Sequence, residues 1–83
     1  EHMAQNIKIN NAFVIYDEPT NKYYCFGDGD KMYASENLDK WKKHESDIPR
    51  LNNPCVVKTR NEYRIYTVNE EGIVLYTSKT FLL

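Results

Sequence analysis

The sequence has little of several features that would point to a class of protein. Its 83 residues include only three glycines and three prolines, and no apolar run approaches the ~20 residues of a membrane span. Eleven basic and twelve acidic residues give a net charge of −1, so the chain lacks the electrostatic footprint of a protein that binds nucleic acid or an anionic membrane. We therefore expect neither of these partners.

Cysteine is also scarce, because only Cys25 and Cys55 occur. Both lie in apolar stretches, and their spacing is not that of metal ligands, so we expect buried free thiols and no metal. A disulfide stays open, since it would need Cα atoms within ~7 Å of each other. No cofactor motif is present, and nothing in the sequence indicates a localisation.

The length allows one small domain. A chain of this size buries only ~60% of its unfolded surface, so we expect an economical core or help from another chain. Glu1-His2-Met3 is typical of residues left by an expression vector. We accordingly interpret residues 1–3 as such a remnant and residues 4–83 as a single all-β domain.

The chain is rich in aromatic side chains, and they recur in a repeated order. Seven tyrosines, three phenylalanines and one tryptophan favour strands. The stretch 10–41 is followed by a looser copy, in which Asn10-Asn11-Ala12 returns as Asn52-Asn53-Pro54 and residues 22–26 return as 62–66. The offset lies between 40 and 43, a period of about 42 residues, which is the size of one four-stranded propeller blade.

Alternating and continuous apolar runs, separated by turn residues, predict an antiparallel all-β protein. The continuous apolar run at 12–16 should be buried on both faces, and 41–44 should be a short charged outer strand, with His44 exposed, that protects a sheet edge. The expected strands are 6–10, 12–16, 22–26, 31–35, 41–44, 54–58, 62–68 and 72–77.

The two copies end differently. In the first copy the outer strand begins at Trp41, six residues after Ser35, whereas the second copy runs only five residues beyond Ser78. We therefore expect two four-stranded blades, about 11–45 and 53–83, with the second completed by strand 6–10 of another chain. Such a contact closes into a ring when the rotation allows, which predicts self-association as a homotrimeric six-bladed or homodimeric four-bladed propeller.

Two motifs resemble a known family. Tyr16-Asp17, then Lys22-Tyr23-Tyr24 with Phe26, and the stretch 33–41 that ends in Leu38-Asp39-Lys40-Trp41, resemble blades of the five-bladed propeller glycosidases, the family 43-like arabinanases and xylosidases. The likeness covers about two of five blades. It implies a propeller with a central funnel, in which the enzymes place catalytic carboxylates, the first from an Asp-Pro pair that opens an innermost strand.

The positions that match this pair are Asn11-Ala12 and Asn53-Pro54. An amide cannot act as the general base or nucleophile of glycoside hydrolysis, although it can bind a sugar hydroxyl. We therefore assign no catalytic residue, and we expect a non-catalytic carbohydrate-binding or scaffold propeller module that acts as a homo-oligomer. The expected ligand contacts, to a glycan, are Asn11, Asn53, Tyr16, Tyr33, Tyr76 and Trp41.

Alternatives remain open at this stage. The asparagines could satisfy turn backbone before a strand, and Trp41 could pack between blades instead of stacking on a sugar. Asp28 and Asp30 fit a solvated hairpin loop better than a calcium site. The alternative function is a fragment of a glycoside hydrolase propeller whose catalytic residues lie outside this chain.

Overall fold

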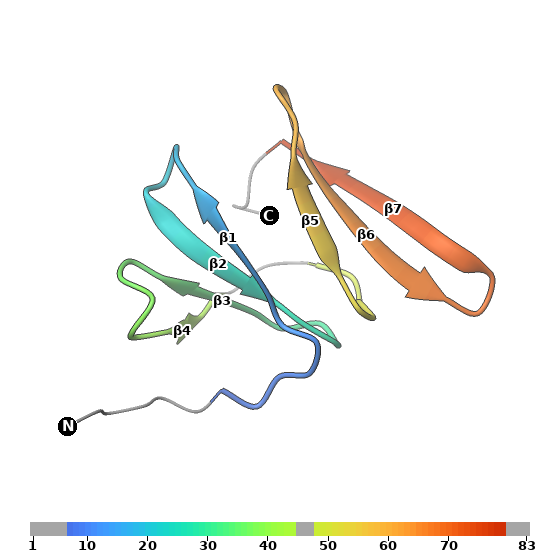
Figure 1. Cartoon of the computed structure of the whole chain (residues 1–83), viewed down its shortest axis with the longest axis horizontal. Helices are drawn as coiled ribbons and strands as arrows, with labels where there is room; N and C mark the ends of the chain where they lie inside the picture. Colours follow the sequence, from blue (N-terminus) through green and yellow to red (C-terminus); the bar gives the residue numbers. More distant parts are fainter. Residues whose placement is uncertain (1–6, 45–47, 80–83) are drawn as a thin grey trace.

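The computed structural model describes residues 7–44 and 48–79, and within them the chain is all-β, with no helix and hence none that could cross a membrane. It forms two antiparallel sheets. The first has the order β1 (Phe13–Asp17), β2 (Lys22–Phe26), β3 (Met32–Ser35) and β4 (Lys42–Lys43). The second has the order β5 (Cys55–Lys58), β6 (Tyr63–Asn69) and β7 (Gly72–Ser78). β1 and β5 meet in the middle, and β4 and β7 lie at opposite sides (Figure 1).

The core lies between the two sheets. Side chains of both sheets and of the connector around Ile48 and Leu51 form one buried apolar cluster, which removes this surface from water. Its members are Tyr24, Phe26, Met32, Ile48, Leu51, Val56, Tyr63 and Ile65.

Each sheet thus has a packed face, which contributes to this core, and an outer face on the opposite side. Because side chains alternate along a strand and paired residues share a face, the strand register defines both. The packed face of the first sheet carries Phe13, Ile15, Tyr24, Phe26, Met32 and Ala34, and its outer face carries Val14, Tyr16, Tyr23, Cys25 and Tyr33. The packed face of the second sheet carries Val56, Tyr63, Ile65 and Thr67, and its outer face carries Cys55, Val57, Tyr66, Val68, Ile73 and Leu75.

The predicted strands agree with the observed ones except at the N-terminal end. The boundaries of β2 match the expected range, and those of the other strands differ from it by at most one residue at either end. Residues 7–10, expected to be part of a strand, form none, and Asn6 lies outside the described residues. By the repeat, residues 7–10 correspond to 49–52 of the connector, which is not a strand either. The expected pairing of 6–10 is with another chain, so it stays a prediction.

The internal repeat is present in three dimensions. Asn10 O accepts a hydrogen bond from Asp28 N at 2.9 Å, and in the second copy Asn52 O accepts one from Val68 N at 3.1 Å. The residues that follow, Asn11 and Asn53, both have left-handed backbone, with φ of 55° and 49°. The two copies therefore enter their first strands in the same way.

Three expectations about burial are wrong for the single chain. Val14 and Tyr16 of the run 12–16 are 48% and 40% exposed, because only one face of β1 meets the other sheet. Cys55 is exposed and only Cys25 is buried, and both thiols are free. His44, expected to be exposed, is half-buried because its ring packs edge-on against Tyr24, with the centroids 5.5 Å apart.

Candidate functional site

Two of the predicted ligand contacts meet at one end of the sheet pair. Asn11 and Asn53 precede β1 and β5, the two strands in the middle of the molecule, and both contact Asp28. The Asn11 side-chain amide donates to Asp28 Oδ2 at 2.8 Å, and the Asn53 backbone N–H donates to Asp28 Oδ1 at 2.8 Å. We call Asn11, Asp28 and Asn53 the asparagine crown.

Local backbone geometry positions the crown. Asparagine tolerates the left-handed conformation that positions 11 and 53 adopt. The loop that carries Asp28 is joined to the start of the second repeat, because Gly29 N donates to Leu51 O at 2.8 Å and Leu51 N donates to Gly29 O at 2.9 Å. Gly29 itself has φ of 98°, which favours glycine. The crown therefore links the two sheets through backbone as well as side chains.

The chemistry of the crown suits binding better than hydrolysis. Asn11 and Asn53 are exposed, and their amides offer both donors and acceptors to a ligand hydroxyl. Glycoside hydrolysis generally uses two carboxyl groups about 5–9.5 Å apart, whereas the crown holds one carboxylate, and both of its oxygens already accept hydrogen bonds. The crown presents hydrogen-bond donors and acceptors, but it offers no acid and base pair.

The four aromatic residues predicted as ligand contacts do not join the crown. Tyr16 lies at the opposite end of β1, where its hydroxyl donates to Asn21 and its ring packs against Tyr23 with the centroids 4.9 Å apart. The ring of Trp41 is held by a hydrogen bond from its Nε1 to Leu38 O at 3.0 Å.

The remaining two lie in different sheets. Tyr33 is half-buried on the outer face of β3 in the first sheet. Tyr76 is 38% exposed on β7 in the second sheet. The six residues predicted as one ligand site are therefore spread over several parts of the molecule, and only Asn11 and Asn53 lie together.

The sequence contained a signal for Asp28 that the prediction did not use. Because β2 runs antiparallel to β1, the residues after β2 must lie beside those before β1. Asp28 follows Phe26 by two residues, and Asn11 precedes Phe13 by two residues. Register alone could have placed this carboxylate beside the asparagines.

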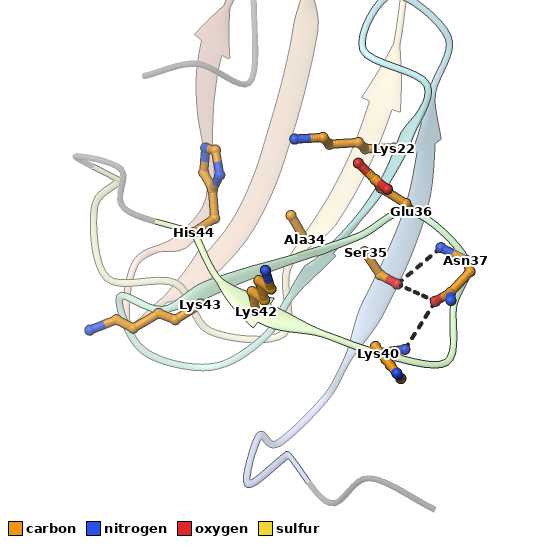
Figure 2. A pocket seen from close by; sticks show the side chains of 9 residues that line it. All are labelled: Lys22, Ala34, Ser35, Glu36, Asn37, Lys40, Lys42, Lys43 and His44. Carbon is orange, nitrogen blue, oxygen red and sulfur yellow. Dashed lines mark hydrogen bonds between the residues drawn. The ribbon is translucent and has the colours of Figure 1, made fainter.

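Sequence reasoning also missed a hollow near β4. Figure 2 shows the side chains that line this cavity, which lies at β2, β3 and β4 of the first sheet. Its volume is about 440 Å³. The pairing of β2, β3 and β4 could have indicated it, because it places lysines of two strands on one face. The lining residues are Lys22, Ala34, Ser35, Glu36, Asn37, Lys40, Lys42, Lys43 and His44.

One buried carboxylate serves to join the sheets. Asp17, at the end of β1, is 2% exposed and accepts hydrogen bonds from Thr20 Oγ1 at 2.6 Å and from the hydroxyl of Tyr63 in the second sheet. The Tyr24 hydroxyl donates to Thr20 Oγ1 at 3.2 Å, which extends this network into β2. A buried carboxylate with such partners stabilises the pairing of the two sheets.

Comparisons with known proteins identify no relative. No family model, no curated protein and no solved structure matches the chain. Within residues 7–44 and 48–79, no group of three or more histidine, cysteine, aspartate or glutamate side chains could hold a metal ion. The candidate site is therefore defined by its own geometry, that of an exposed amide and carboxylate crown between two repeated sheets.

Proposed function

We propose that this chain is a non-catalytic, carbohydrate-binding propeller module that acts as a ring of identical copies. Each of its two sheets is one blade in this proposal, and the asparagine crowns surround the central funnel. The observation that carries the proposal is the way the two repeats pack on each other.

The sheets pack through faces that are not equivalent in the repeat. Phe13 and Ile15 of the first packed face correspond to Cys55 and Val57, which lie on the outer face of the second sheet. The outer faces of the molecule are thus the repeat counterparts of the faces that form the core.

The outer face of the first sheet likewise corresponds, in the repeat, to the packed face of the second sheet. Val14 on the first outer face corresponds to Val56 on the second packed face, and Tyr23 corresponds to Tyr63. Contacts between such unlike faces are heterologous, and a heterologous contact repeats from copy to copy until a ring closes or a filament grows.

A second copy of the chain is therefore the occupant we assign to the outer faces. The outer face of the second sheet exposes Val57, Val68, Leu75 and, at 75%, Ile73. The outer face of the first sheet exposes Val14 and Tyr16. Contiguous exposed apolar residues of this kind mark interaction surfaces, and docking one outer face on the other repeats the packing already present inside the chain.

The N-terminal segment supports the same arrangement. A Cβ atom at Gly27 would lie 2.1 Å from Ile9 Cγ1, so Ile9 packs directly against the end of β2. Ile9 corresponds to Leu51, which fills the core between the two sheets. In the ring, residues 7–10 take the connector position between two copies, and β7 is an edge strand beyond which no further strand is paired among the described residues.

The ring brings together the crowns of its copies. Each crown offers exposed amides and one carboxylate at the end of the innermost strands β1 and β5. Exposed planar amide and carboxylate groups provide the paired donors and acceptors that a sugar hydroxyl requires. A neutral oligosaccharide is therefore the ligand we assign to the funnel.

The assembly is tested with a charge placed on the outer face. Ile73→Lys puts an ammonium group where the proposal has an apolar contact, so we expect the oligomer to dissociate, as measured by analytical ultracentrifugation over a range of concentrations. Asn61→Lys adds the same charge in the exposed turn between β5 and β6 and should leave the oligomer intact. Equal dissociation constants of the oligomer for the two variants would show that the outer face of the second sheet does not contact another copy.

The sugar site is tested with glycine in place of asparagine. Asn11→Gly with Asn53→Gly removes both amides and keeps the left-handed backbone. We expect this variant to lose the binding that an array of neutral oligosaccharides detects, whereas Asn21→Gly, also at positive φ but at the far end of β1, should retain it. An intact oligomer that binds none of the sugars excludes the carbohydrate function, and hydrolysis of aryl arabinosides or xylosides would exclude its non-catalytic character.

A further inference from the structure

We propose that the hollow beside β4 binds a sulfate or phosphate group. We call it the basic hollow and define it by Lys22, Lys40, Lys42, Ala34 and Glu36, with the other lining residues named above. The proposal is independent of the ring and of the sugar crown, because the residues that define the hollow all come from the first sheet and its β3–β4 loop.

Strand register explains how the hollow forms. Ala34 pairs with Tyr24 on one side and with Lys42 on the other, so these three side chains share the packed face of the first sheet. Lys22 lies two residues before Tyr24 and shares this face too. Ala34 has a short side chain, so it forms the floor between the longer side chains of Lys22 and Lys42, which Figure 2 shows around it.

The charge of the hollow is strongly positive, although the whole chain has a net charge of −1. Four lysines line it, against the single carboxylate of Glu36. Lys43 pairs with Tyr33 and so lies on the outer face, which leaves Lys22, Lys40 and Lys42 to supply the positive charge. Within the described part of the chain, none of these lysines forms an ion pair with a carboxylate; the ion pair that is present joins Arg64 to Glu62 in the other sheet. The ammonium groups are therefore available to an external anion.

The loop that carries Lys40 is held in place by side-chain hydrogen bonds. Ser35 Oγ accepts from Asn37 N at 3.2 Å and from Leu38 N at 2.9 Å. Asn37 Oδ1 accepts from the backbone N–H groups of Asp39 at 2.9 Å and Lys40 at 3.0 Å, as Figure 2 shows in part. These bonds fix the rim of the hollow before any ligand arrives, which lowers the ordering cost of binding.

Protection of the sheet edge explains some of these lysines but not all. Charged residues on an edge strand discourage pairing with another chain, and this accounts for Lys42 and Lys43 on β4. Lys22 lies on β2, which is an interior strand with neighbours on both sides. Its place on the same face as Lys42, over the small Ala34, requires another explanation, and an anion between the two ammonium groups provides one.

The lining suits a phosphate or sulfate group. The described lining contains lysines and no arginine, and lysine is a common phosphate ligand that acts as a point charge. A volume of about 440 Å³ is also in the range of small-molecule pockets and exceeds what one bare ion needs. An ester of sulfate or phosphate on a small molecule therefore fits better than a bare ion.

The proposal is tested by titrating the isotope-labelled chain while amide chemical shifts are recorded. The probes are glucose 6-sulfate, glucose 6-phosphate, inorganic sulfate, inorganic phosphate and neutral glucose, with the ionic strength held constant by sodium chloride. We expect saturable shifts for the amides of residues 35–44 with the four anions and none with glucose. If the sugar esters bind more tightly than the inorganic anions, the ligand of the hollow is an ester. If the two kinds of probe bind equally, the hollow recognises the free anion.

Matched variants separate the site from general electrostatics. Lys22→Gln with Lys42→Gln should weaken binding by about tenfold or more, because two charge-assisted contacts are lost. Lys31→Gln with Lys79→Gln changes the net charge equally at exposed positions outside the hollow and should change the affinity by less than about twofold. Lys22→Arg with Lys42→Arg keeps the charges and should keep binding. Shifts that sodium chloride alone reproduces, or equal losses in the two glutamine variants, would overturn the proposal.

Discussion

The two repeats share a backbone plan but use opposite faces for the core. In the first sheet Phe26 is fully buried against the second sheet, whereas its counterpart Tyr66 is half-buried on an outer face. In the second sheet Tyr63 and Ile65 are buried, whereas Tyr23, the counterpart of Tyr63, is half-buried on an outer face. Each sheet therefore carries two apolar faces, and one chain covers only one of them.

The largest expected change in the free energy of unfolding comes from a substitution on a packed face. Phe26→Ala should lower the free energy of unfolding by about 3–5 kcal/mol, because it leaves a cavity between the sheets. Tyr66→Ala, at the matching position, should cost about 1 kcal/mol in the single chain, because its side chain is only half-buried. Urea unfolding at low protein concentration measures both, and Phe26→Leu provides a milder variant where alanine abolishes folding. Equal losses would show that the two faces are not used differently.

A smaller effect is expected from the matched tyrosine hydroxyls. Tyr63→Phe removes the donor to buried Asp17 and should lower the free energy of unfolding by about 1–3 kcal/mol. Tyr23→Phe, at the corresponding position of the first repeat, should change it by less than about 0.5 kcal/mol, because the Tyr23 hydroxyl has no hydrogen bond in the described part of the chain. Thermal unfolding of the two variants side by side makes the comparison. A larger loss for Tyr23→Phe would refute the role given to the Asp17 network.

The left-handed entries to the two repeats share a backbone cost. Asn11→Ala and Asn53→Ala each place a side chain with Cβ in a left-handed backbone that asparagine tolerates better, which should cost about 1 kcal/mol at each position. Asn11→Ala should cost more than Asn53→Ala, because it also removes the side-chain hydrogen bond to Asp28, whereas Asn53 bonds Asp28 through its backbone. Asn53→Gly should cost less than Asn53→Ala, since glycine adopts this backbone without a steric penalty. Chemical unfolding distinguishes these cases, and an alanine variant as stable as the parent would contradict the backbone argument.

The smallest effect concerns thiol reactivity and leaves stability unchanged. Cys25 is buried, and this burial raises the pKa of its thiol above the ordinary value of 9.0, against a smaller opposite contribution from a hydrogen bond with the Phe13 backbone. Its reactive thiolate therefore forms only at higher pH than usual, so Cys25 should react slowly with iodoacetamide near neutral pH and faster as the pH rises above 9.0. Cys55 is exposed and should react first.

Association of copies should slow the reaction of Cys55 with iodoacetamide. Cys55 lies on the outer face of the second sheet, so we expect it to react fast at dilution and slowly at concentrations where copies dock. Mass spectrometry of the labelled chain reports each cysteine separately. A Cys55 labelling rate that does not change with protein concentration would show that this face is not covered by another copy.

Much of the fold could be predicted because local signals agree. Turn residues such as Asn21, which has φ of 57°, and the apolar runs between them determined where strands begin and end. The repeat predicted two sheets of similar plan, which the equivalent hydrogen bonds to Asn10 O and Asn52 O confirm. Patterns of period two identify a strand, but they do not tell which molecule covers each face.

The features that sequence reasoning missed depend on contacts between distant strands. The run 12–16 is apolar throughout, yet Val14 and Tyr16 are exposed, because only one face of β1 meets the other sheet. The antiparallel register of β1 and β2 places Asp28 in the crown, and the pairing of β2 with β3 places Lys22 at the basic hollow. Each of these placements follows from register, which the spacing of residues within one strand does not determine.

Docking of the unlike outer faces on further copies would raise the mass of the chain in solution. Light scattering after size-exclusion chromatography, over a wide range of concentrations, measures this mass. We expect a closed oligomer at two or three times the 9.8 kDa of one chain. A folded chain that remains at 9.8 kDa at the highest concentration would contradict it.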